Sequence, residues 1–136
     1  MPRYMLDTDI SSYVMKRSSA PVLDRLRETA VAEVCISVIT KAELLYGVEL
    51  SPRPEQDRTA LEAFLLHVET LEFQDAAAVH YAAIRASLKR RGQLIGANDL
   101  LIAAHARSLD LVLVTNNTAE FSRVTDLKLE NWTQPR

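Results

Sequence analysis

Tyr4-Met5-Leu6-Asp7-Thr8-Asp9 is a short apolar run that stops at two acidic residues spaced i, i+2. An apolar run this close to the start of a chain predicts a buried strand. Open α/β sheets bind their ligands at the carboxyl ends of the strands, and Asp7 lies at that end of this one. The stretch therefore predicts an α/β fold with a polar site where the first strand ends.

The rest of the chain continues the alternation of strands and helices. Short apolar runs predict strands over residues 34–37 and 111–114, with weaker signals at 70–73 and 127–130. Apolar residues at helical spacing predict helices over residues 11–16, 21–29, 38–50, 55–67 and 100–109, and a long one between Asp75 and Gly92. Strands separated by helices imply a parallel central sheet of four to five strands between helices.

The composition is that of an ordinary globular protein, and we expect one domain over residues 1–136. Hydrophobic residues make up 48% and charged residues 25% of the chain, which argues against disorder. The formal net charge of -2 excludes a generally basic, sequence-indifferent nucleic-acid binder. No apolar stretch is long enough for a membrane span or a signal peptide, so we expect a cytoplasmic protein that does not contact a membrane.

Several common catalytic motifs are missing from the sequence. Three glycines in the whole chain cannot form a dinucleotide fingerprint or a phosphate loop. The three histidines are too scattered for a zinc site that could be identified from sequence. The single cysteine, Cys35, lies in an apolar run, which indicates a buried small hydrophobic residue rather than a nucleophile.

Three acids set among apolar neighbours are the strongest candidates for chemistry: Asp7, Glu43 and Asp99. Each also has a purely structural interpretation, because Asp7 or Asp9 can cap a helix, Glu43 can close a capping box with Thr40, and Asp99 suits a helix first turn. Acids are rarely buried without a partner, and no lysine or arginine lies beside Asp7 or Asp99 in the sequence. A divalent cation relieves the repulsion between converging carboxylates. Oxygen ligands without histidine or cysteine favour Mg²⁺ or Mn²⁺.

Thr115-Asn116-Asn117 follows the strongest predicted strand. Its polar groups join Asp7 at the same edge of the sheet if the two strands are neighbours. An Asx turn after a strand explains the same residues equally well. Gly47 and Ala103 each lie one helical turn beyond a candidate acid, where we expect small residues to leave room for a substrate backbone.

Four ordered motifs resemble those of the PIN-domain ribonucleases, and among them the VapC-type toxins of bacterial toxin–antitoxin modules. The motifs are Met5–Ile10 (MLDTDI), Thr40–Gly47 (TKAELLYG), Ile95–Ala106 (IGANDLLIAAHA) and Val114–Phe121 (VTNNTAEF). The resemblance covers essentially the whole chain and implies a PIN domain. It also implies that Asp7, Glu43 and Asp99 hold Mg²⁺ or Mn²⁺, with Thr115 and Asn117 completing the site.

The resemblance further implies a metal-dependent endoribonuclease that inhibits translation. The implied substrate is structured RNA, above all tRNA, and the implied partners are a VapB-type antitoxin over the active-site groove and a second copy of the chain. Two positions depart from the family pattern. Many relatives have asparagine where this chain has Asp9, an acid that either binds metal or caps a helix. Other branches have aspartate where this chain has Asn117, which offers a carbonyl oxygen but no charge, so the number of bound ions stays open.

Two other functions are open on this sequence. A haloacid-dehalogenase-type phosphatase places its nucleophile and acid pair after a strand, as in Asp7-Thr8-Asp9, and Val114-Thr115-Asn116 resembles its second motif. Only about 20 residues follow this second motif, and they lack the lysine and the paired-acid motif of that family. A non-catalytic binding module would use the acids only as helix caps. RNA cleavage that depends on a divalent cation distinguishes the nuclease from both.

Overall fold

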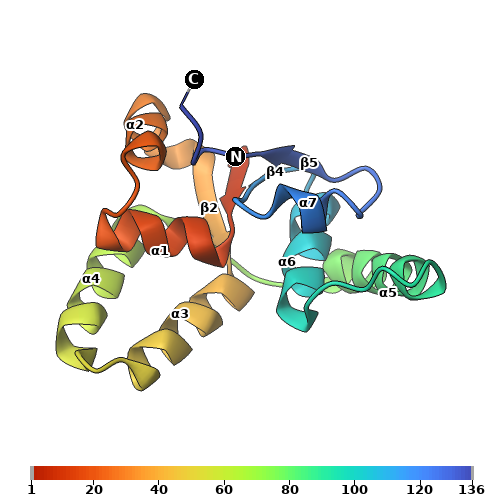
Figure 1. Ribbon diagram of the computed structural model, residues 1–136, viewed down its shortest axis with the longest axis horizontal. Coiled ribbons are helices and arrows are strands. Elements are labelled where there is room, and N and C mark those ends of the chain that lie inside the picture. The colour runs from red at the N-terminus through yellow and green to blue at the C-terminus, as the bar shows by residue number, and fades with distance from the viewer. Residues whose placement is uncertain (1, 136) are drawn as a thin grey trace.

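The computed structural model describes residues 2–135, which form a five-stranded sheet between two groups of helices (Figure 1). The strands are β1 (Tyr4–Leu6), β2 (Val34–Ser37), β3 (Glu69–Leu71), β4 (Val112–Val114) and β5 (Lys128–Glu130). The helices in this part of the chain are α1 (Thr8–Lys16), α2 (Ala20–Glu28), α3 (Val38–Leu50), α4 (Pro54–His67), α5 (Asp75–Arg90), α6 (Ala97–Ser108) and α7 (Thr118–Phe121), with a 3-10 turn, η1, at Val31–Glu33. The predicted α/β class is confirmed.

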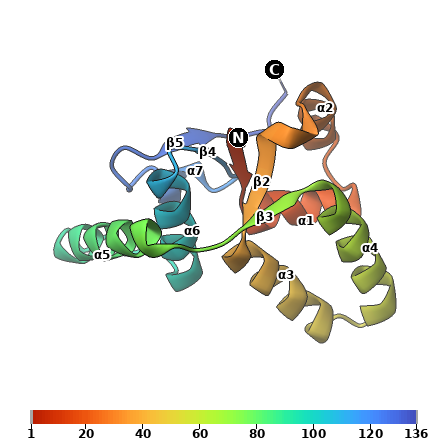
Figure 2. The same cartoon turned by 180° about the vertical axis from the view of Figure 1, so that it is seen from behind.

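All four strand pairings are parallel, and the strand order is β3-β2-β1-β4-β5. The chain leaves β1 to build β2 and β3 on one side of it, and later returns to build β4 and β5 on the other side. Helices α1 to α4 gather on one side of the sheet and α5 to α7 on the other in both views (Figures 1 and 2). The carboxyl ends of β1 and β4 therefore lie side by side, at the point where the strand order reverses.

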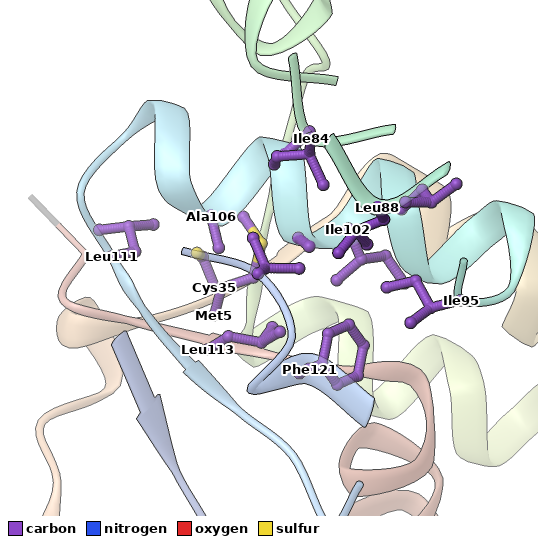
Figure 3. Packing of buried hydrophobic residues seen from close by; sticks show 14 residues of the cluster. Met5, Cys35, Ile84, Leu88, Ile95, Ile102, Ala106, Leu111, Leu113 and Phe121 are labelled. Atoms are coloured by element: carbon purple, nitrogen blue, oxygen red, sulfur yellow. The ribbon is translucent and has the colours of Figure 1, made fainter. Parts of the chain in front are cut away.

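The two faces of the sheet bury separate hydrophobic clusters. Met5 and Cys35 face the cluster that α5 and α6 cover, where they pack with residues such as Ile102 (Figure 3). Tyr4 and Leu6 face the opposite cluster, which α1, α3 and α4 cover. Because both faces are covered, the central strands β1, β2 and β4 are apolar nearly throughout and show no alternating pattern. The predicted burial of Cys35 is confirmed.

The predicted element boundaries differ from the structure mainly at the first turns of helices. Helix α1 begins at Thr8, three residues before the prediction, and α6 begins at Ala97 rather than at residue 100. The two helices begin with Thr8-Asp9 and with Ala97-Asn98-Asp99, which carry no large apolar side chain and so lack the apolar spacing on which the prediction rests. Helix α7 and the turn η1 were not predicted, because a single turn is too short to show a period.

The longest helix of residues 2–135, α5, ends as its sequence predicts. Gly92 has a φ of +66°, the left-handed conformation that glycine adopts without strain. Its amide donates to the carbonyl of Lys89 at 3.1 Å, and the amide of Gln93 donates to that of Leu88 at 2.8 Å. In the described part of the chain, no helix combines the length and apolar character that crossing a membrane requires.

The segment that follows β5 packs against β1 through Trp132, which is fully buried. Its ring meets that of Tyr4 edge-on with 5.2 Å between centroids, and the guanidinium carbon of Arg25 lies 5.1 Å from its ring centroid. The indole nitrogen donates to Glu130 at 3.0 Å, and Arg25 donates to the same carboxylate oxygen at 2.9 Å. This cluster fixes the segment after β5 to the first strand and to α2.

Candidate active site

Asp7 is at once the helix cap and the most buried of the candidate acids. It is the N-cap of α1, and its Oδ1 accepts a hydrogen bond from the amide of Ile10 at 2.9 Å. Its own amide donates to the carbonyl of Val114 at 3.0 Å, which joins the end of β1 to the end of β4. Its side chain also hydrogen-bonds that of Thr115, and the residue is only 5% exposed. The capping interpretation is therefore correct, but it accounts for one carboxylate oxygen only.

Burial raises the pKa of Asp7 to about 7. The hydrogen bonds from Thr115 and Ile10 lower this pKa, whereas the nearby charges of Asp9 and Asp99 raise it further. None of the ion pairs among residues 2–135 includes Asp7. Burial without a cationic partner thus shifts Asp7 toward its neutral form, and a nearby positive charge would shift it back toward the ionised form.

Asp99 lies in the first turn of α6, where a helix favours negative charge. Burial nevertheless raises its pKa to about 6, and the neighbouring carboxylates of Glu120, Glu43 and Asp9 raise it further, in that order of importance. Asp99 is thus one member of a set of like charges that converge from several elements. The first-turn interpretation describes its position but not its surroundings.

The capping box proposed for Thr40 and Glu43 is wrong. Helix α3 begins at Val38, and its N-cap is Ser37, whose hydroxyl oxygen accepts from the amide of Ile39 at 3.1 Å. Glu43 therefore lies in the second turn, and its carboxylate is turned toward other elements. Its Oε1 accepts from the hydroxyl of Thr8 at 2.5 Å, and its Oε2 accepts from the amide nitrogen of Asn98 at 3.3 Å.

The turn after β4 presents Asn117 with a defined orientation. Its backbone amide donates to the hydroxyl oxygen of Thr115 at 2.9 Å, so the side chain that closes this turn is a threonine and not the asparagine of the predicted Asx turn. Its side-chain nitrogen donates to the carboxylate of Glu120, which also accepts from the amide of Gly96 at 3.2 Å. A carboxylate can bond only the nitrogen of an amide group, so the carbonyl oxygen of Asn117 is the atom left to face a ligand.

Glu120 is the acid that sequence reasoning missed. It lies on α7, three residues after Asn117, and is the charge that most raises the pKa of Asp99. The only local signal was the i, i+3 spacing of the two residues, which places them on one side of a helical turn. Without a predicted helix at this place, that spacing had no structural meaning.

Asp9 does not cap a helix, since Asp7 has that role. It is an exposed acid in the first turn of α1, and it raises the pKa of both Asp7 and Asp99 through its charge. An asparagine at this position would contribute no such charge. Asp9 thus makes the cavity mouth more negative, which increases the electrostatic attraction for a cation.

The candidate side chains meet in a cavity of about 210 Å³ at the carboxyl edge of the sheet. Its lining residues are Asp7, Thr8, Asp9, Glu43, Asp99, Asn117 and Phe121. Four of the five residues predicted for the site thus line one cavity. The fifth, Thr115, is fully buried behind Asp7.

A second cavity of about 200 Å³ continues from the first, because Thr8, Asp9 and Glu43 line both. Gly47 lines it as well, with open space where a side chain would begin. Ala103 does not share this role, contrary to the prediction, because it is fully buried in the cluster under α6. A larger cavity of about 440 Å³ lies beside β3 and the start of α5, and none of the candidate acids lines it.

The donors in the candidate cavity suit a hard divalent cation. They are carboxylate oxygens and one amide carbonyl, and burial leaves Asp7 without a counter-charge. Among residues 2–135, no three acidic, histidine or cysteine side chains converge closely enough to enclose an ion as they stand. Like charges separate when nothing neutralises them, and Glu43 and Glu120 bond neutral donors instead. That Asp7, Glu43 and Asp99 are the ligands stays a prediction.

Comparison with known proteins finds a matching family and similar sequences. The sequence profile of the PIN domain matches residues 4–127. Ribonuclease VapC2 of Haemophilus influenzae is 48% identical over 132 residues, which are 97% of this chain and 99% of that protein. The tRNA(fMet)-specific endonuclease VapC of Shigella flexneri is 42% identical over the same shares of the two chains.

Solved structures agree with these sequence relatives. A chain of the DNA-bound VapBC complex from Salmonella typhimurium superposes with a TM-score of 0.92 at 39% identity, over 97% of this chain and 99% of that one. A chain of the VapBC2 complex from Rickettsia felis, bound to a DNA fragment from its promoter, superposes with a TM-score of 0.89 at 39% identity, over 95% and 98%.

Proposed function

This chain belongs to the PIN-domain family, and we propose that it is a cation-dependent endoribonuclease of the VapC type. The observation that supports the proposal most is the single cavity lined by Asp7, Glu43, Asp99 and Asn117, which four separate segments contribute. The family assignment leaves the phosphatase alternative without support. We also propose that residues 1–136 act as one domain.

Asp7 and Asp99 are the proposed ligands of Mg²⁺ or Mn²⁺, together with Glu43. When bound, such an ion supplies positive charge that polarises a phosphodiester and lowers the pKa of a water molecule. Thr115 holds the carboxylate of Asp7 from behind. Because Glu120 fixes the amide nitrogen of Asn117, the carbonyl oxygen of Asn117 is available to orient a water molecule in the cavity.

Glu43 has the role of orienting the attacking water and accepting its proton as the phosphodiester bond breaks. Glu43 lines both cavities, and this position suits the role. An RNA strand in the second cavity would pass Glu43 before it reaches the other acids of the candidate cavity. The excess of carboxylates repels phosphate, so a substrate must supply specific contacts elsewhere. This favours a selective enzyme over one that degrades all RNA.

We propose tRNA as the substrate class and a VapB-type antitoxin as the partner. The first rests on the name of the Shigella relative, a tRNA(fMet)-specific endonuclease, and the second on the VapBC complexes among the structural neighbours. Cleavage of tRNA by this chain would inhibit translation in the cytoplasm, and antitoxin binding would prevent it. A homodimer is part of the same proposal, and a solution mass twice that of one chain would test it.

The deciding experiment uses purified protein freed of any partner and incubated with total tRNA, with Mg²⁺ or Mn²⁺ or with a chelator. We expect cleavage only with the cation, and none by the Asp7→Asn variant. Asp24→Asn is the matched control, because Asp24 is an exposed acid on α2 outside both cavities. Cleavage that persists in Asp7→Asn would overturn the proposed mechanism.

A further inference from the structure

The carboxylate of Glu43 is held by two uncharged donors from elements far apart in the sequence. Thr8, at the start of α1, donates to Oε1, and Asn98, in the first turn of α6, donates to Oε2. The donors lie 35 and 55 residues away from Glu43 along the chain. The two bonds thus join α3, which carries Glu43, to helices on both sides of the cavity.

The two hydrogen bonds differ in strength. The Thr8 bond is 2.5 Å long, at the short end of the range for a hydroxyl on a carboxylate, where the charge strengthens the bond. The Asn98 bond is 3.3 Å long, beyond the usual range for an amide nitrogen and oxygen. Oε1 is therefore held firmly, whereas Oε2 is free to exchange its weak partner for a stronger one.

A second acceptor, the hydroxyl of Thr40, lies near the hydroxyl of Thr8. Thr40 is fully buried one turn before Glu43 on α3, and its hydroxyl oxygen lies 3.3 Å from that of Thr8. A hydroxyl has one proton, so Thr8 can donate to Glu43 or to Thr40 but not to both at once. The 2.5 Å bond to Glu43 is the stronger of the two, because 3.3 Å is beyond the usual distance between two hydrogen-bonded hydroxyl oxygens.

We propose that Thr8 is a positioning residue that holds Glu43 at the cavity, and that Asn98 is a releasable second contact. A glutamate side chain loses considerable rotamer freedom when it is fixed, and the Thr8 bond fixes it before any ligand binds. When a cation or its water enters, Oε2 leaves Asn98 while Oε1 stays on Thr8. The proposal rests on the proposed role of Glu43 and extends it to residues outside the acidic set.

Thr8→Val tests the proposal, since valine keeps the branched shape and removes the hydroxyl. We expect the Kd for Mn²⁺, measured by calorimetry, to rise roughly tenfold, the effect typical of losing a residue that orients a metal ligand. We expect kcat on tRNA to fall by a similar factor while KM stays unchanged. Thr8→Ser, which restores the hydroxyl, should return both values close to wild type, and Asn98→Ala should change them less than Thr8→Val does.

The matched control is Thr59→Val, because Thr59 is an exposed helical threonine whose hydroxyl donates to the carbonyl of Glu55, outside both cavities. Wild-type Mn²⁺ affinity and kcat in Thr8→Val would overturn the proposal. Equal losses in Thr8→Ser and Thr8→Val would also overturn it, even if valine disturbs folding. A Mn²⁺ affinity that depends on the Thr8 hydroxyl, in a protein that cleaves no RNA, would overturn the endoribonuclease proposal alone.

Discussion

At the scale of single residues, Asp7 is both a buried carboxyl and a helix cap. A buried carboxylate is unfavourable, yet the first turn of α1 needs an acceptor for the amide of Ile10. A protonated Asp7 satisfies the helix with one oxygen at little electrostatic cost, because its pKa is raised to about 7. In the proposed role, the same residue would bind a cation that supplies the missing positive charge.

The Asp7→Asn variant should therefore be more stable than wild type when no cation is present. At pH 8 the ionised Asp7 lowers the free energy of unfolding of the wild type. A pKa raised by about three units corresponds to an upper bound of about 4 kcal/mol, so we expect the variant to gain about 1–3 kcal/mol in the free energy of unfolding. Asparagine keeps an acceptor for Ile10 and carries no charge. Urea unfolding in chelator measures the gain.

The pH dependence of this gain identifies its cause. The folded pKa of Asp7 is raised, so the associated stability is present below the unfolded value of 3.8 and is lost as the pH rises to about 7. The difference between Asp7→Asn and wild type should grow from pH 4 to pH 7 and be constant above it. A gain that does not vary with pH would contradict this explanation.

At the scale of elements, the cavity depends on where helices begin. Helices α1 and α6 start at the carboxyl edge of the sheet, and their first turns carry Thr8, Asp9, Asn98 and Asp99. The free amides of a helix start favour negative charge, which partly offsets the repulsion among the acids. Helix α3 differs, because its acid lies in the second turn and depends on Thr8 for its position.

Gly47→Ala should raise stability, because an exposed glycine inside a helix costs about 1 kcal/mol relative to alanine. A β-carbon at this position meets nothing within 4 Å, so no clash cancels the gain. We expect the melting temperature to rise by about 3 °C. Calorimetry checks the expectation, and a lower melting temperature would show that the helix needs glycine here.

At the scale of the whole molecule, the segment after β5 completes the core beside the first strand. Trp132→Ala would remove the largest fully buried side chain and leave Arg25 and Glu130 without their aromatic neighbour. We expect a loss of about 3–5 kcal/mol in the free energy of unfolding, measured in urea. Trp132→Phe, which refills most of the volume, should cost clearly less. Equal losses in the two variants would assign the effect to the indole hydrogen bond instead.

Cation binding should release protons, since two of the proposed ligands have raised pKa values. Asp7, with a pKa of about 7, and Asp99, with a pKa of about 6, must both be ionised to hold the ion. The apparent affinity for Mn²⁺ should be about twentyfold lower at pH 6 than at pH 8, and nearly level above pH 8. Calorimetry in two buffers of different ionisation enthalpy counts the released protons. Equal affinity at pH 6 and pH 8 would contradict the proposed ligand set.

The amino-acid sequence alone is enough to predict the strands, the longer helices and most of the candidate acids. Apolar runs predict β1, β2 and β4, weaker signals predict β3 and β5, and Asp7, Glu43 and Asp99 stand out because their neighbours in the sequence are apolar. These properties are local, because a strand or a helix shows its period within a few residues. The family resemblance, carried by four short motifs, is local in the same sense.

Which of these residues meet depends on the tertiary structure. The pairing of β1 with β4 brings Asp7 and Asn117 to one edge of the sheet, and the return of α7 brings Glu120 beside Asn117 and Asp99. The bonds from Thr8 and Asn98 to Glu43 cross 35 and 55 residues, where no periodicity extends. Strand order and such long-range bonds form because both faces of the sheet must be buried at the same time. That requirement involves all the helices and strands together, so no single segment of the sequence can show it.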